Sequence, residues 1–335
     1  MRYVIQRFAA LLVTLWVAIT VNFFLPRLMP GNPVEAMFAR YQGKVSPSAI
    51  NSMEQVFGLN THSTELHQYL DYLKNTISGN LGVSFSYFPA SVSSLIKADL
   101  PWTLGLVGVA TILAFILGTS LGIFAAWRRG TVGWKRGSVV DSGLVPFALV
   151  LGALPAFWIA LVFVYFIAFK FGWFPIGGSI DAGDSVTSWS GIGSILDHSV
   201  LPGLTLILVS TGIWILLMRN NMMTVLGEDY VRFARAKGLP GRSIATRYAA
   251  RNAVLPVVTQ LALALGVVVG GQIFIEIVFS YRGIGYLLLQ AVENEDYPLM
   301  QGIFLIFTVT LLIASFLADM ANLVLDPRVR LESRS

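Results

Sequence analysis

Six long stretches without a charged side chain constrain this chain more than any other feature of its sequence. A helix needs about 20 mainly apolar residues to cross a bilayer core, because lipid offers the backbone no hydrogen-bond partner. The stretches that meet or approach this length are Phe8–Pro26, Leu100–Trp127, Ser142–Phe169, Ser199–Met218, Asn252–Ile275 and Tyr297–Ala318. Only 12% of the 335 residues are charged, against roughly 25% in soluble domains. The sequence therefore predicts an all-α integral membrane protein with six transmembrane helices.

Lysine and arginine are distributed unevenly across the predicted membrane. Six spans put both termini on one side, and the short segments on that side hold 16 of the 23 lysines and arginines. These segments are 1–7, 128–136, 219–251 and the tail from 322. Short loops rich in Lys and Arg remain in the cytoplasm. We therefore expect both termini to be cytoplasmic, in the cell membrane of a prokaryote.

Composition further divides the chain into consecutive segments. Residues 1–29 form the first transmembrane helix, which we interpret as an uncleaved anchor because no small-residue cleavage site follows it. Residues 30–99 form a polar extracytoplasmic segment, partly helical because apolar residues recur at helical spacing over Glu65–Ile77. Residues 100–323 form the membrane core, with a cytoplasmic loop at 219–252, and residues 324–335 form a cytoplasmic tail. The Gly- and Ser-rich loop Gly172–His198 is expected to be irregular and exposed.

The features that the spans lack argue against several functions. An ion-coupled carrier usually places charged or titratable side chains inside its spans, and the six stretches contain no charged residue. The chain has no phosphate-binding G-x-x-x-x-G-K-[ST] motif, no cysteine and no catalytic cluster at helical spacing. A stand-alone channel, an ion-coupled carrier and a membrane-bound enzyme are therefore the weaker alternatives. If this chain moves a solute uphill, a partner supplies the energy.

The cytoplasmic loop contains a block, Tyr230–Val257, with six lysines and arginines and no acid. Acids at Glu228 and Asp229, Gly238 in a left-handed position and Pro240 after it predict a short helix, a tight turn and a second helix from about Ser243 to Asn252. The first helix is expected to carry Tyr230, Phe233, Ala234 and Lys237 on one face, with Arg232 and Arg235 at its rim. Two interpretations stay open from the residues alone: a knob that docks in a groove of another protein, or an anchor that contacts lipid phosphates.

Several motifs along the chain resemble those of the permeases of ATP-binding-cassette importers. ARAKG at Ala234–Gly238, followed by Leu255-Pro256, resembles their cytoplasmic coupling motif, and the long gap between the two resembles the dipeptide/oligopeptide/nickel branch, specifically its first permease subunit. Further matching motifs are LMPGNP at 28–33, GNLGVS at 79–84, LPWTL at 100–104, PAFW at 155–158, EIVF at 276–279, GIG at 283–285, DYP at 296–298, QG at 301–302 and LDPRVR at 325–330. Asn replaces the usual Asp in two of them, both in the external segment.

This resemblance implies a type I importer permease fold and a set of partners. They are a second homologous permease, two cytoplasmic ATPases that bind ATP and Mg²⁺, and an extracytoplasmic binding protein that delivers short peptides. This chain itself then needs no cofactor or metal and is not an enzyme. Oligosaccharides and nickel chelates remain alternative solutes. The resemblance also implies that Tyr230, Arg232, Phe233, Ala234, Arg235, Lys237 and Gly238 couple the chain to an ATPase.

A second candidate region lies after the fifth span. Glu276, with Phe279 and Gly283, is expected at an apolar outer mouth, as part of the translocation path or of the outer gate. Glu276 either binds the solute, holds the gate, or caps the amides of the next turn as an exposed helix-end carboxylate at the membrane interface. His62, His67 and His198 lack the spacing of metal ligands, so we expect surface histidines.

Overall fold

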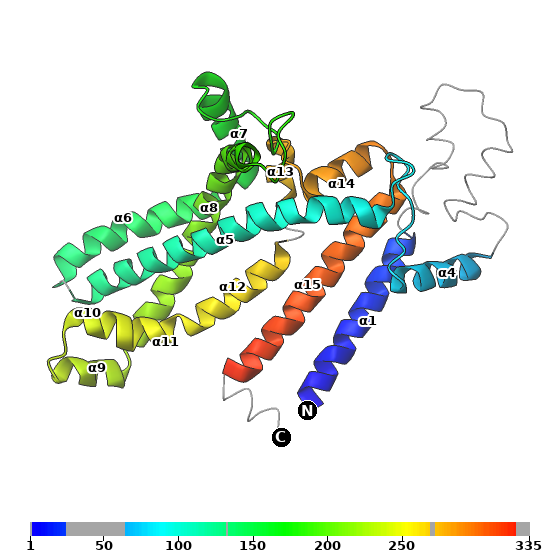
Figure 1. Cartoon of the computed structure of the whole chain (residues 1–335). Coiled ribbons are helices and arrows are strands. Elements are labelled where there is room, and N and C mark those ends of the chain that lie inside the picture. Colours follow the sequence, from blue (N-terminus) through cyan, green and yellow to red (C-terminus); the bar gives the residue numbers. More distant parts are fainter. Residues whose placement is uncertain (1, 25–63, 132, 269–271, 326–335) are drawn as a thin grey trace. The chain divides into compact units, whose positions relative to one another are not determined.

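The computed structural model describes residues 2–24, 64–131, 133–268 and 272–325 (Figure 1). The LMPGNP motif, His62 and residues 326–335 of the predicted tail lie outside the described residues. The described residues are helical apart from loops and one isolated bridge between Val83 and Ser91. They form two compact units, each assembled from segments distant in sequence. Unit 1 comprises Met1–Thr103, Val269–Ile273 and Arg282–Phe316, and unit 2 comprises Leu104–Val268, Phe274–Tyr281 and Leu317–Ser335.

Four of the described helices are long and apolar enough to cross a membrane, and two bent helix pairs raise the number to six if each pair is one span. The four helices are α1 (Arg2–Phe24), α5 (Val92–Thr131), α8 (Trp189–Leu226) and α15 (Tyr297–Leu325). The predicted number of six spans therefore matches the larger count. Both α5 and α8 begin well before the stretches predicted for them.

The third predicted span is broken rather than straight. Helix α6 (Gly133–Ala153) ends before Pro155, and α7 (Ala156–Phe163) continues as the π-helix η2 (Val164–Lys170) at an angle of 92° to α6. A residue that precedes proline is disfavoured in helical conformation, so the break falls where Leu154 precedes Pro155. Both α6 and α7 pack against α8.

The fifth predicted span also consists of a bent pair. Residues Gly241–Ala253 meet α12 (Leu255–Val267) at 49°, and Pro256 lies at the start of α12. The short helix α13 (Ile273–Val278) follows α12, and α14 (Ile284–Glu293) precedes α15. The prediction of one helix over Asn252–Ile275 is therefore wrong in its bounds, because proline interrupts the helix near its start and α12 ends at Val267.

The expectation of an irregular, exposed loop over Gly172–His198 is wrong from Trp189 onward. Helix α8 begins there because the Ser188 side chain caps it, accepting a hydrogen bond from the Gly191 backbone N–H at 3.0 Å. His198 lies inside this helix and is 8% exposed, so it is not a surface histidine. His67, on helix α4 (Glu65–Ile77), is exposed as expected.

Within unit 2, glycines let the long helices approach each other closely. A Cβ atom added at Gly118 of α5 would lie 2.4 Å from the Trp214 Cβ of α8. One added at Gly122 would lie 2.7 Å from the Ile215 carbonyl oxygen of α8. A Cβ atom added at Gly212 would lie 2.5 Å from the Ala148 carbonyl oxygen of α6. Small residues at helix contacts are the usual means of close packing in membranes, and they fix α8 against α5 and α6.

Within unit 1, a buried apolar cluster joins α14, the start of α5 and the start of α15. Its members are Phe85, Val92, Ile96, Ile284, Leu287, Leu288, Ala291, Tyr297, Leu299, Met300 and Ile303. Asp296, fully buried, accepts hydrogen bonds from the Ser84 hydroxyl, the Ser86 backbone N–H at 2.9 Å and the Leu299 backbone N–H at 3.2 Å. This carboxylate therefore ties the loop before α5 to the first turn of α15.

Candidate functional site

The basic block predicted from the sequence forms an elbow, residues 227–253, that follows α8 in unit 2. Its first helix, α9 (Asp229–Ala236), begins after Glu228, whose carbonyl accepts hydrogen bonds from the N–H groups of Val231 and Arg232 at 3.1 and 3.2 Å. Asp229 occupies the first turn and Arg235 the last, which is the charge order that suits a helix dipole. The predicted start of this helix is therefore confirmed.

The turn after α9 depends on Gly238. Its φ of 71° lies in the left-handed region, which glycine enters without steric cost. The Gly238 N–H donates to the Arg235 carbonyl at 2.9 Å, and the Leu239 N–H donates to the Ala234 carbonyl at 3.3 Å. These two bonds are those of a Schellman motif. The predicted left-handed glycine is confirmed, and it reverses the chain within a few residues.

The second helix of the elbow begins at Gly241, slightly before the predicted start. It consists of α10 (Gly241–Ser243), the π-helix η3 (Ile244–Ala250) and α11 (Arg251–Ala253). A Cβ atom added at Gly241 would lie 3.1 Å from the Trp127 ring of α5. The absence of a side chain at Gly241 therefore allows this end of the elbow to lie close to α5.

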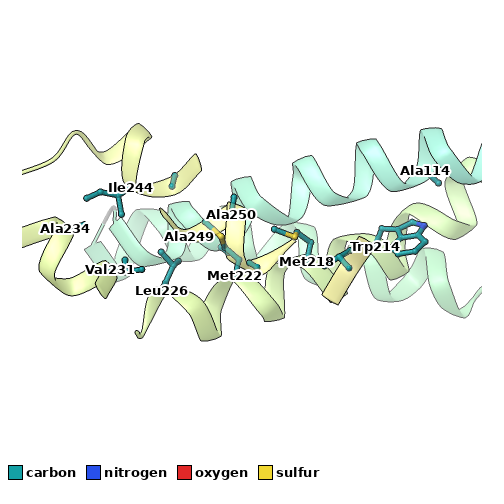
Figure 2. Packing of buried hydrophobic residues seen from close by; sticks show 14 residues of the cluster. Ala114, Trp214, Met218, Met222, Leu226, Val231, Ala234, Ile244, Ala249 and Ala250 are labelled. Carbon is teal, nitrogen blue, oxygen red and sulfur yellow. The ribbon is translucent and has the colours of Figure 1, made fainter. Parts of the chain in front are cut away.

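A buried apolar cluster holds the inner side of the elbow against α8 and α5, and Figure 2 shows its members. They are Ala114, Ala126, Trp214, Met218, Met222, Leu226, Val231, Ala234, Ile244, Ala245, Ala249, Ala250, Ala253 and Val257. Val231 is fully buried and Ala234 is 2% exposed. The prediction that Ala234 lies on an outward face with Phe233 is therefore wrong, because Ala234 and Val231 together form the inner face of α9.

The outward face of α9 carries aromatic and cationic side chains. Phe233 is 61% exposed and Tyr230 40%, while Arg232, Arg235 and Lys237 are all exposed. The Lys237 ammonium lies 4.6 Å from the centre of the Phe233 ring, within the range of a cation–π contact. Such a face presents an apolar ring surrounded by positive charge.

One hydrogen bond that the sequence did not predict links the two helices of the elbow. The Asn252 side-chain amide donates to the Tyr230 hydroxyl at 2.8 Å and to the Tyr248 carbonyl at 3.2 Å. This bond fixes one edge of the outward face of α9 to α11. The sequence signal for it was weak, because the two residues lie 22 positions apart.

Glu276 and Phe279 are deeply buried in unit 2. Glu276 is 1% exposed and Phe279 2% exposed. The expectation of an exposed helix-end carboxylate is therefore wrong. Its neighbour Tyr281 is also buried, and burial raises the pKa of this phenol above its ordinary value; the Glu276 carboxylate raises it further, while a hydrogen bond with Ser199 lowers it.

The segment after α13 is bound to the loop before α8 by its backbone. The Gly178 N–H donates to the Phe279 carbonyl at 2.9 Å, and a Cβ atom added at Gly177 would lie 2.7 Å from the same oxygen. The hydroxyl groups of Tyr281 and Ser199 lie 3.0 Å apart and share a hydrogen bond. Phe279 is thus held by backbone contacts that require glycine opposite it.

The same loop is held to α8 by a small polar cluster. The Ser194 hydroxyl accepts from the Asp181 N–H at 2.7 Å and donates to the Asp181 carboxylate at 2.9 Å. His198 Nδ1 lies 2.8 Å from the Ser194 carbonyl oxygen, and its Nε2 lies 3.9 Å from Asp181 Oδ1. The Ser194 Oγ also lies 3.5 Å from His198 Nδ1. Because the Ser194 hydroxyl donates its proton to the carboxylate at the shorter distance, the cluster differs from a Ser–His–Asp triad, in which the serine donates to the histidine.

Gly283, the third residue of the predicted outer mouth, belongs to unit 1. It precedes α14 in extended conformation, with φ of 171°. Around it, Arg282 Nε donates to Asp99 at 2.6 Å and the Ile284 N–H donates to the Thr103 hydroxyl at 2.8 Å. These contacts fix the start of α14 against α5.

Comparison with known proteins identifies the family. Residues 118–331 match the family described as "Binding-protein-dependent transport system inner membrane component". The chain is 32% identical to the di/tripeptide transport system permease protein DppB of Pseudomonas aeruginosa, over 98% of each chain. It is 30% identical to the oligopeptide transport system permease protein AppB of Bacillus subtilis, again over 98% of each chain. The dipeptide transport system permease protein DppB of Alkalihalophilus pseudofirmus is 31% identical, over 98% of this chain and 99% of its own. The chain therefore belongs to the family of inner membrane components of binding-protein-dependent transport systems.

Proposed function

We propose that this chain is the permease subunit of an ATP-binding-cassette importer for short peptides, paired with a second, homologous permease. An extracytoplasmic binding protein delivers the peptide, and two cytoplasmic ATPases with bound ATP and Mg²⁺ supply the energy. The observation that carries this proposal is the construction of the elbow. Its inner face is packed into the chain's own cluster, while its outward face leaves Phe233 and three cations exposed.

This construction suits the transmission of movement. In the proposed mechanism, the outward face of α9 lies in a groove of one ATPase and follows that ATPase when ATP binding closes the pair. The buried cluster moves with it because Val231 and Ala234 pack against α8, and the Asn252–Tyr230 bond carries α11 along. Rocking of such rigid helices switches a path between inward- and outward-facing states. Gly238 supplies the sharp turn that this coupling needs.

Coupling is tested by Phe233→Asp in the complete transporter, reconstituted in proteoliposomes with all partner subunits. We expect normal insertion, a normal melting temperature and loss of peptide-stimulated ATP hydrolysis, because Phe233 is exposed and contributes little to the fold. Arg247→Asp is the matched control, since Arg247 is exposed on η3 and lies outside the proposed docking face. Ala234→Asp is unsuitable, because it would bury a carboxylate in the cluster.

Two results would count against the coupling role. One is peptide-stimulated hydrolysis at the wild-type rate in Phe233→Asp. The other is an equal loss in Arg247→Asp, which would show that charge in this cytoplasmic segment matters and the face of α9 does not.

The solute class is tested separately with the binding protein of the same transporter. Peptide substrates are proposed because the relatives above are named as transporters of dipeptides, tripeptides and oligopeptides. We expect dipeptides to pentapeptides to stimulate hydrolysis, whereas oligosaccharides and nickel chelates do not. Stimulation by either of those alone would replace the peptide assignment and leave the coupling role untouched. Accumulation of solute by the purified chain alone would overturn the importer assignment.

A further inference from the structure

Helix α4 (Glu65–Ile77) lies crosswise at the Phe24 end of α1 in unit 1 (Figure 1). The Tyr69 hydroxyl is hydrogen-bonded to the Thr20 hydroxyl at 2.8 Å, and the Tyr72 hydroxyl accepts from the Asn22 amide at 3.2 Å. The Phe23 ring lies between the two tyrosines, with its centre 5.2 Å from that of Tyr69 and 5.4 Å from that of Tyr72. Because α1 is long and apolar enough to cross a membrane, these contacts place α4 where α1 leaves the hydrocarbon core.

A second row of apolar side chains on α4 is not covered by α1. Leu66 is 68% exposed, Leu70 53% and Ile77 83%. Helical residues are separated by about 100°, so these positions align along one stripe, about 110° around the helix from the tyrosines. His67, Asp71 and Lys74 lie further around the helix and form its polar face. The helix therefore has three distinct sides: one against α1, one apolar and one polar.

Helix α1 also carries a row of exposed apolar side chains among the described residues. Val17, Val21 and Phe24 follow one another at helical spacing along α1 and are 47%, 56% and 44% exposed. On a helix that crosses a membrane, such side chains face lipid. A short helix fixed at the end of this surface, with an apolar side beside its protein contact and a polar side beyond, has the pattern of a helix that lies in the plane of the membrane interface.

We propose that α4 is an interfacial helix whose Leu66, Leu70 and Ile77 side chains insert among the acyl chains of the leaflet into which α1 emerges. The partner of this surface is the lipid bilayer. Helix α4 would then fix how deeply α1 is inserted in the membrane. Tyr69 and Tyr72 would lie at the level of the headgroups, where tyrosine is enriched. This inference requires only that α1 spans the membrane and is independent of the transported solute.

The natural absence of cysteine makes a site-directed labelling test direct. Single variants Leu66→Cys, Leu70→Cys and Ile77→Cys are compared with Asp71→Cys and Lys74→Cys on the polar face, and with Val21→Cys as a lipid-facing reference. Each is spin-labelled in the complete transporter, in nanodiscs of phosphatidylethanolamine and phosphatidylglycerol. Accessibility to oxygen, which concentrates in lipid, is compared with accessibility to a water-soluble nickel chelate. Three stripe positions keep the test open if one variant does not fold.

We expect an oxygen-to-nickel accessibility ratio at the stripe positions several-fold higher than at Asp71 and Lys74 and close to that at Val21. Equal nickel accessibility on both faces would overturn the proposal, because the stripe would then face water. Labels shielded from both reagents would also overturn it, since another protein surface would cover the stripe. If shielding appears only when the extracytoplasmic binding protein is added, that protein is the partner instead of lipid.

Discussion

The two buried clusters are built from different side chains and by different means. In unit 2, half of the cluster that holds the elbow is alanine, and its other members include one tryptophan and two methionines. In unit 1, the cluster contains a single alanine, is made largely of leucine, isoleucine and aromatic residues, and adjoins the fully buried Asp296 with its hydrogen bonds. The first depends on close backbone approach, whereas the second depends on larger side chains and directional polar contacts.

This difference teaches how each region responds to a change. A contact between backbones cannot yield without moving whole helices, so the unit 2 cluster holds α5, α8 and the elbow together as a stiff body. A buried carboxylate specifies which loop amides lie beside it, so Asp296 fixes one arrangement of the loop before α5. The first is suited to transmitting a movement and the second to keeping a loop in place.

The largest expected effect is overpacking at Gly122. A Cβ atom there would lie 2.7 Å from the Ile215 carbonyl oxygen and 2.9 Å from the Met218 Cβ, so Gly122→Ala forces α5 away from α8. We expect a loss of about 3 kcal/mol of stability, measured by thermal or denaturant unfolding in detergent.

Gly108→Ala on the same helix is the matched control, because a Cβ atom there would have no neighbour within 4 Å. It should be neutral or stabilise α5 slightly, since alanine is the better helix former. Equal effects at the two glycines would refute the view that unit 2 depends on close backbone approach.

A somewhat smaller loss is expected at Asp296. Asp296→Ala leaves the Ser84 hydroxyl and the N–H groups of Ser86 and Leu299 without their acceptor, which costs about 2–3 kcal/mol. Asp296→Asn keeps one acceptor oxygen and should lose less. Denaturant unfolding of both variants measures the loss of stability, and the rate of protease cleavage within residues 83–91 measures how far the loop is released. A loop that stays protected in Asp296→Ala would show that the apolar cluster alone holds it.

The elbow illustrates how far sequence reasoning reaches. Local signals sufficed for α9 and its turn, because Glu228, Asp229, Gly238 and Pro240 act on their own neighbours. Three- and four-residue spacing grouped Ala234 with Phe233 but did not reveal which side would be covered, since that depends on α8 and η3. The π-helical conformation of η3 has no comparable local signal.

Outside the elbow, the errors also came from contacts between residues distant in sequence. Residues Ser142–Phe169 were predicted as one span because their apolar character is continuous, although Pro155 marks the position of the break. His198 was expected at the surface because the three histidines lack the spacing of metal ligands and its own loop was expected to be exposed. Its burial depends on Asp181 and Gly178 folding back onto α8, which composition does not encode. Glu276 was likewise expected to be exposed but is buried, and composition does not encode the tertiary contacts that bury it.

The smallest expected effect sharpens the comparison, because it concerns a directional contact within unit 2. Tyr281→Phe removes the hydrogen bond to Ser199, and we expect a loss of about 1 kcal/mol at neutral pH.

The variant should also change how the stability of the protein responds to alkaline pH. Burial raises the pKa of Tyr281 above 10.0, so in the unfolded chain this phenol ionises at a lower pH than in the folded chain. The contribution of the buried Tyr281 phenol to the free energy of unfolding is therefore fully present below pH 10.0 and is lost as pH rises above that value. Unfolding measured from neutral pH to beyond 10.0 should show a shallower decline in Tyr281→Phe than in the natural chain. Parallel declines would mean that the phenol reaches water in the folded protein, and that unit 2 gains nothing from burying this contact.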